Sequence, residues 1–178
     1  HCVYDRAAKK WYPGWTFIPA YRDGNAPYGS FPGAQAWTMT AYITSGGTKN
    51  DVAVVKLGNN SAGRNAPYYV GYLGRSWNYS YTQHHHAFGY PSNLNSGKYT
   101  WICAAESFNA GTGVLGMGCN MTFGSSGGPW IKKFTPNLGG SVNSVNSVVS
   151  GGTPGTPTFY GARFTDGNIV PLCAAAGC

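Results

Sequence analysis

The sequence predicts an all-β protein made of many short strands, and three observations support this class. Apolar and polar residues alternate with a period of two, most clearly where Trp37, Met39, Ala41 and Ile43 alternate with threonines and a tyrosine. Clusters of Gly, Pro, Asn and Ser separate such segments. No segment shows the pattern of an ordinary amphipathic helix, although residues 168–176 favour a short one. Together these features predict a sandwich or a barrel.

The expected strands follow one another at short intervals along the chain. After the strand that contains Trp37, they are expected over 52–57, 68–73, 84–90, 99–105, 114–118, 129–134, 142–149 and 158–164. Turn-forming clusters lie at 26–33, 58–66, 91–97, 109–113, 135–140 and 150–157. The segment 139–156 is low in complexity and is expected to form a hairpin with a loop.

The composition indicates a globular chain without a nucleic-acid or membrane partner. Of its 178 residues 42% are hydrophobic and only 10% are charged, which furnishes a core and excludes a charged disordered protein. The formal net charge is +7, but the 12 Lys and Arg residues are scattered and form no basic stripe. No stretch approaches the ~20 apolar residues of a membrane span.

Five cysteines in so lightly charged a chain indicate an oxidising compartment and a secreted protein. Cys103 and Cys119 flank a Gly-rich turn at 111–113, so a hairpin would bring them together. The odd number leaves one cysteine without a partner in this sequence. Metal ligation is the alternative role for cysteines, but the chain contains neither Cys-x-x-Cys nor a zinc-type spacing.

Residues 124–129, with the sequence Gly-Ser-Ser-Gly-Gly-Pro, give the clearest chemical signal. A hydroxyl nucleophile needs a turn that exposes its Oγ and aims free N–H groups at the developing oxyanion. Glycines permit such a turn because they accept φ > 0. Alone, the run also fits an ordinary loop in which Ser126 has no catalytic role. However, His1 and Asp51 precede Ser126 in the chain order of one type of Ser-His-Asp triad.

In these three segments the chain resembles the chymotrypsin-like (trypsin-fold) serine proteases, and within them the secreted bacterial branch that includes the glutamyl endopeptidases. The resemblance implies two antiparallel β-barrels and a secreted serine endopeptidase. Such an enzyme hydrolyses proteins or peptides through an acyl-enzyme and needs no cofactor. The first barrel, over 1–78, would carry His1 and Asp51, and the second, over 79–178, would carry Ser126. We expect a monomer.

The resemblance assigns a role to each matching residue. The first two residues match the end of the family's Thr-Ala-Ala-His-Cys motif, which implies that His1 is the general base. Asp51 matches the start of the family's Asp-Ile-Ala-Leu segment and would orient His1; from the residues alone it could also cap the following strand. Ser126 matches the nucleophile of Gly-Asp-Ser-Gly-Gly-Pro, with the N–H groups of Gly124 and Ser126 as the oxyanion hole. Ser125 replaces that Asp, so activation through an ion pair at this position is not expected.

His1 is the first residue of the sequence, whereas this family should have a strand and a turn before its catalytic histidine. Either the sequence is incomplete, or the chain is cut just before His1 and an upstream fragment of the same protein is retained as a partner or lost. The first barrel is therefore expected to lack its N-terminal strands.

The resemblance also implies a pairing of the cysteines. Cys2 would bond a cysteine upstream of the histidine, which is absent from this sequence. Similar secreted bacterial proteases have a pair where Cys103 and Cys119 lie. Cys173 and Cys178 are then left for each other.

The resemblance indicates the primary specificity pocket as well. The residue six before the nucleophile would lie at its base, and here it is Asn120, which supplies no anion for an Arg or Lys side chain. The glutamyl enzymes use a His beside the Trp-Gly-Gly of a pocket-wall strand. The best match here is Ser150-Gly151-Gly152, preceded by Val149, without that histidine. We therefore expect a neutral, mainly apolar or aromatic residue on the acyl side of the cut.

Other features allow other functions. His84 and His86 would share one face of a strand, as either a metal pair or a polar strand edge, and no metal is assigned to them. An N-terminal histidine with a distant second one also resembles the copper brace of lytic polysaccharide monooxygenases, which would leave Asp51 and Ser126 unexplained. The third alternative is a non-catalytic binding module whose exposed Trp and Tyr stack on sugars.

Overall fold

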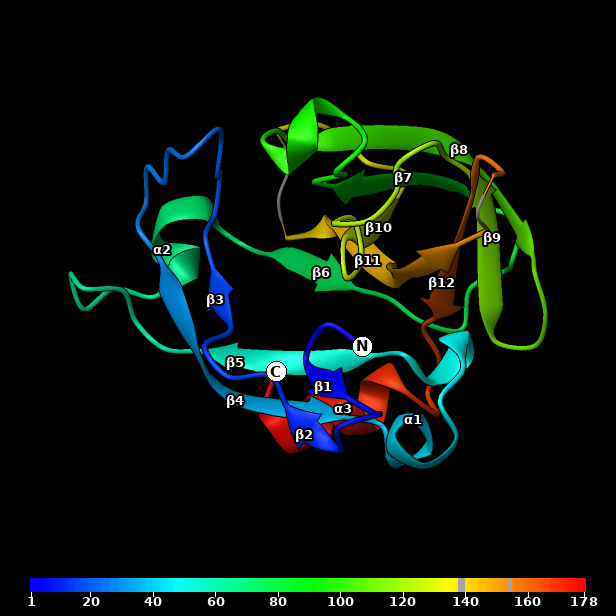
Figure 1. Cartoon of the computed structure of the whole chain (residues 1–178), viewed down its shortest axis with the longest axis horizontal. Helices are drawn as coiled ribbons and strands as arrows, with labels where there is room; N and C mark the ends of the chain where they lie inside the picture. The colour runs from blue at the N-terminus through cyan, green and yellow to red at the C-terminus, as the bar shows by residue number, and fades with distance from the viewer. Residues whose placement is uncertain (138–139, 154) are drawn as a thin grey trace.

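The computed structural model describes residues 1–137, 140–153 and 155–178 (Figure 1). Over these residues, the larger of its sheets contains seven strands. All but one of these close into an antiparallel barrel. Their spatial order is β10 (Pro129–Lys132), β7 (His84–Gly89), β8 (Trp101–Asn109), β9 (Val114–Gly118), β12 (Thr158–Arg163) and β11 (Gly140–Gly152). β11 pairs with β10 and closes the barrel. The remaining strand, β6 (Leu73–Arg75), pairs with β11 in parallel.

The first third of the chain forms smaller sheets beside the barrel (Figure 1). A three-stranded antiparallel sheet contains β3 (Thr16–Phe17), β4 (Phe31–Thr38) and β5 (Ala53–Leu57). A separate hairpin joins β1 (Tyr4–Asp5) to β2 (Lys10–Trp11). The C-terminal helix α3 (Ile169–Ala176) crosses back and packs against β4 and β5. The predicted all-β class is confirmed.

Two hydrophobic cores hold these parts together. One fills the barrel around residues such as Leu115, Met117 and Trp130, all nearly inaccessible to solvent. The other lies where the smaller sheet, the barrel and α3 meet, and it includes Val52 and Leu172. Val52 directly follows Asp51 in sequence. Packing of this second core therefore fixes the position from which the Asp51 side chain extends.

The expected strand over 37–43 is wrong beyond its first residues. β4 ends at Thr38, and Thr40–Ser45 form the helix α1. The N–H of Gly46 bonds the carbonyl groups of Ala41 and Tyr42 and closes this helix, in a conformation with φ +69° that favours glycine. An alternating pattern of only a few residues is compatible with both structures, and the tertiary context decided it.

The expected strand over 68–73 is also wrong, because Ala66–Val70 form the helix α2. The side chain of Asn65 accepts a hydrogen bond from the N–H of Tyr68, and Pro67 lies in the first turn. Both features favour a helix start. Two 3₁₀ turns, η1 (Thr48–Asn50) and η2 (Asn95–Gly97), complete the elements.

The remaining expected strands occur, with shifted ends. The short C-terminal helix that the sequence favours over 168–176 is present as α3. Parts of the expected turns at 135–140 and 150–157, and of the segment 139–156, lie outside the described residues. No helix in the described part of the chain is long and apolar enough to cross a membrane.

Candidate active site

The loop between β9 and β10 carries Ser126, and its glycines shape it. Gly124 and Gly127 have φ of +91° and +80°, which L side chains rarely adopt. A Cβ at Gly128 would overlap the carbonyl oxygen of Phe88 on β7. The N–H of Gly127 donates to Val149 on β11 at 2.8 Å, and Val149 donates back to Gly128 at 2.9 Å. The loop is thus fixed to two strands of the barrel.

This loop leaves backbone donors free beside a hydroxyl. Ser126 is half-buried. Within the described residues, the N–H groups of Gly124 and Ser126 donate to no protein acceptor. The neighbouring Ser125 is buried, with 1% exposure, and lies against Gly89. The turn therefore buries one serine and presents the other next to two unpaired donors.

His1 and Asp51 form a hydrogen-bonded pair at the edge of the smaller sheet. The Nδ1–H of His1 donates to Oδ2 of Asp51 at 2.5 Å, and the backbone nitrogen of His1 donates to Oδ1. The Asp51 side chain is only 9% exposed, against 38% for that of His1. The hydrogen bond to Asp51 is the main cause that raises the pKa of His1 above its ordinary value.

Ser150 provides a third contact to Asp51. Its Oγ–H donates to Oδ2 at 2.6 Å. Val149 pairs with Gly161 and Gly151 with Tyr160, so the register of β11 against β12 shifts between them and Ser150 is the extra residue of a bulge. Sequence reasoning placed Ser150 in a pocket wall, and it missed this hydrogen bond because a bulge has no sequence signal of its own here.

The three predicted triad residues meet at one cavity of about 370 Å³. His1, Asp51 and Ser126 all line it. Its other walls are mainly apolar, and the side chains there include Trp15, Phe17, Val55, Leu57, Val148 and Val149. Among the described residues, no hydrogen bond joins the His1 ring to Ser126 Oγ. The arrangement thus brings a hydroxyl, an imidazole and a carboxylate to one site, and the imidazole and the carboxylate are hydrogen-bonded to each other.

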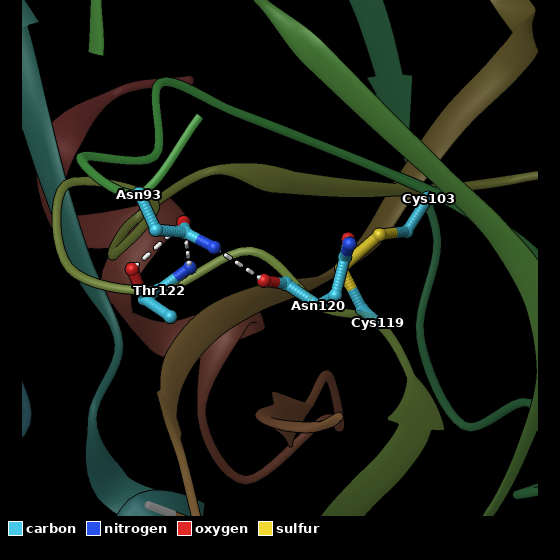
Figure 2. Close-up of a disulfide and its surroundings, with 5 residues drawn as sticks. All are labelled: Asn93, Cys103, Cys119, Asn120 and Thr122. Atoms are coloured by element: carbon cyan, nitrogen blue, oxygen red, sulfur yellow. Dashed lines mark hydrogen bonds between the residues drawn. A yellow bond between two sulfur atoms is a disulfide. The ribbon is translucent and has the colours of Figure 1, made fainter. Parts of the chain in front are cut away.

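Asn120 lies just after β9, at the start of the loop that carries Ser126, and its side chain is exposed. Asn93 fixes its backbone, as Figure 2 shows: the Asn93 amide donates to the carbonyl of Asn120 at 2.9 Å. The Oδ1 of Asn93 accepts from both the N–H and the hydroxyl of Thr122, at 3.0 and 2.8 Å. Of the expected pocket residues, neither Asn120 nor 150–152 is among the described residues that line the cavity.

Two disulfides lie where the sequence predicts them. Cys103 on β8 is bonded to Cys119, with a Cα–Cα distance of 5.6 Å (Figure 2). Cys173 in α3 is bonded to Cys178. Cys2 is exposed and free within the described chain. The first disulfide links β8 to the start of the loop that carries Ser126, and so it adds a covalent anchor to the loop's backbone hydrogen bonds.

Comparison with known proteins gives structural neighbours only. No family model matches the chain, and the search of curated proteins found no match. The protease Anisep from Arthrobacter nicotinovorans superposes with a TM-score of 0.82 at 28% identity, over 94% of this chain and 76% of that one. The thermostable serine protease AL20 from an extremophilic microorganism superposes with a TM-score of 0.80 at 29% identity, over 94% of this chain and 77% of that one.

A third neighbour shares the fold at lower identity. A Glu endopeptidase solved in complex with MPD has a TM-score of 0.80 at 21% identity, and the match covers 99% of this chain and 77% of that one. The chain therefore has the trypsin-like fold, and its structural neighbours are bacterial trypsin-like serine proteases that include a Glu endopeptidase.

Proposed function

We propose that the chain is a serine endopeptidase in which Ser126 is the nucleophile, His1 the general base and Asp51 the residue that orients it. The observation that carries this proposal is the meeting of these three residues at one cavity, with His1 already bonded to Asp51. The serine protease neighbours support the same class of reaction.

The chemistry follows from the positions of these groups. His1 takes the proton of Ser126 Oγ, and the oxygen attacks the carbonyl carbon of the scissile peptide bond. The carbonyl oxygen becomes negative and accepts hydrogen bonds from the N–H groups of Gly124 and Ser126, which are unpaired among the described residues. His1 then protonates the leaving amine, and water releases the acyl group by the reverse sequence. No cofactor takes part.

Asp51 has two functions in this proposal. Its carboxylate accepts from Nδ1–H, which leaves Nε2 as the basic nitrogen that would take the proton of the serine. It also stabilises the imidazolium that forms when His1 accepts the proton. The missing bond between His1 and Ser126 Oγ is expected to form when a substrate occupies the cavity, since catalytic hydrogen bonds often tighten only in the complex.

The specificity that we propose is for a neutral, mainly apolar or aromatic residue on the acyl side of the cut. Asn120 carries no charge, and 150–152 contain no histidine. Cleavage-site profiling on a peptide library tests this directly. A strong preference for Glu, or for Arg and Lys, would overturn the assignment of the pocket and leave the triad untouched.

We propose an extracellular location, with proteins or peptides as substrates. The two disulfides support this, because such bonds persist in oxidising environments. Secretion is tested by fractionating a culture of the native host and locating the intact chain with an antibody.

The test of the activity is hydrolysis of a quenched fluorescent peptide library. We expect cleavage by the purified chain and none by S126A, while S61A, a change at an exposed loop serine, keeps full activity. Peptide binding by a wild-type chain that cleaves nothing would instead support a binding module with this fold.

A further inference from the structure

Three consecutive histidines on β7 point to alternate faces of the barrel. His85 is inaccessible to solvent, and its ring lies between the Ser107 hydroxyl at 3.0 Å and Asn146 Oδ1 at 2.7 Å. His84 and His86 lie two residues apart and therefore share the opposite, outer face. His84 is exposed and His86 half-buried. The outer pair is remote in sequence from the proposed triad and has no part in its chemistry.

The two outer rings are close enough to share one metal ion. The His84 and His86 ring centroids are 5.0 Å apart, with planes at 75°. Two imidazoles bound to one ion through metal–nitrogen bonds of about 2.0–2.1 Å have centroids roughly 4.5–5.2 Å apart, between right-angle and tetrahedral geometry. The observed separation falls in that range, so the two rings are close enough to bind one ion.

The strand β8 places one acidic and one small side chain opposite the pair, while on the β10 side the N–H of Lys133 donates to the His84 carbonyl at 3.3 Å. In the register of β7 with β8, Glu106 is directly opposite His84 and Ala104 directly opposite His86. Both are exposed, so one supplies a negative charge near the pair and the other a small side chain beside it. The ring of His86 packs against that of Phe134, with the two centroids 5.7 Å apart, and this contact restricts the orientation of the His86 ring.

The nitrogens of this pair are not engaged elsewhere. In the described part of the chain, neither ring makes a hydrogen bond, and Nδ1 of His86 is buried without a partner.

We propose that His84 and His86 form a two-histidine site for a divalent transition-metal ion of the Zn²⁺, Ni²⁺ or Cu²⁺ class. Among the described residues, no three His, Cys, Asp or Glu side chains are grouped closely enough to hold an ion. The pair therefore supplies two ligands, water completes the coordination, and Glu106 contributes charge. Imidazole suits these ions, whereas Mg²⁺ and Ca²⁺ prefer oxygen ligands and are not expected to bind.

The test is calorimetric titration of the untagged, chelator-treated chain with ZnCl₂ and NiCl₂. We expect one ion per chain, and an affinity at least about tenfold lower in H84A and in H86A, since each removes one of two ligands. H1A is the matched control, because His1 is the other histidine outside the barrel interior. H1A should bind as the wild type does.

Two outcomes would overturn the proposal: unchanged Zn²⁺ affinity in the double variant H84A/H86A, or loss of binding in H1A. Thermal unfolding gives a second readout, since an ion that binds the folded chain raises the midpoint. ZnCl₂ should raise it in the wild type and in S126A, but not in H84A/H86A. The S126A arm separates this site from the proposed peptidase activity, because a failure of either leaves the other intact.

Discussion

Asp51 is the residue whose contacts organise the candidate site. Its carboxylate accepts hydrogen bonds from the ring and the backbone of His1 and from the hydroxyl of Ser150. A carboxylate that is 9% exposed needs such donors, because burying an unpaired charge is costly. The same contacts fix the His1 ring, so burial of one side chain sets the orientation of another.

Replacing Asp51 by Asn tests this coupling through the pH dependence of activity. Since Asp51 raises the pKa of His1, the protonated, inactive ring persists to higher pH, and kcat/KM should fall as pH drops through a value above the ordinary 6.5. In D51N we expect this acidic limb of the pH profile of kcat/KM to move to lower pH. We also expect kcat to drop on the order of 10⁴-fold. A limb at the same pH in both proteins would show that Asp51 does not control His1.

Removing the Ser150 hydroxyl tests the third contact. S150A takes one hydrogen bond from a mostly buried carboxylate, which is worth about 1 kcal/mol, or roughly a fivefold lower kcat. KM should hardly change if Ser150 acts through Asp51. A rise in KM at constant kcat would instead place Ser150 in direct contact with the substrate, which is the role that the sequence alone predicted.

At the scale of elements, the Ser126 loop is shaped by glycines and anchored by strands. β7 excludes a side chain at Gly128, and Val149 of β11 exchanges backbone hydrogen bonds with Gly127 and Gly128. The sequence predicted this loop well, because adjacent glycines and serines have strong local preferences. It also predicted the β8–β9 hairpin that brings Cys103 to Cys119.

Other elements could not be predicted, and the reasons are physical. The alternating residues around Ala41 form a helix because packing and the closing Gly46 outweigh a short pattern. Asn65 at the N-cap and Pro67 in the first turn favour a helix start, but the tyrosines that follow have a high β propensity and led to the prediction of a strand. The bulge at Ser150 depends on the register against β12, which is set far away in the sequence.

A pair of glycine substitutions tests the packing of the loop. In G128A the new Cβ meets the Phe88 carbonyl, and we expect a loss of at least about 3 kcal/mol in unfolding free energy. G118A in β9 is the control, since a Cβ there meets nothing within 4 Å. Its stability should stay within about 1 kcal/mol of the wild type in urea denaturation. Equal stability of the two variants would contradict the close approach of β7 to the loop.

For the whole molecule, the site lies where two packed units meet. Asp51 precedes β5 of the smaller sheet, Ser126 belongs to the barrel, and the second hydrophobic core joins them through Val52 and α3. The proposed chemistry therefore depends on the packing of the smaller sheet against the barrel. The disulfides stabilise this folded structure because they restrict the conformations of the unfolded chain.

The two disulfides should contribute unequally. Cys103–Cys119 closes a separation of 16 residues and Cys173–Cys178 one of 5. Loop entropy then gives about 3 kcal/mol for the first and about 2 kcal/mol for the second. Urea denaturation of the variants C103S/C119S and C173S/C178S checks this order. The first variant should also lose activity at temperatures where it remains folded, because the bond anchors the start of the loop that carries Ser126.

The most direct test of the central claim is covalent labelling of the purified chain with a fluorophosphonate, followed by mass spectrometry of its peptides. The proposed triad predicts one adduct per chain, on Ser126, that is absent in S126A and strongly reduced in H1A. A native chain that remains unlabelled, or that is labelled equally in S126A, would contradict the assignment of Ser126 as an activated nucleophile.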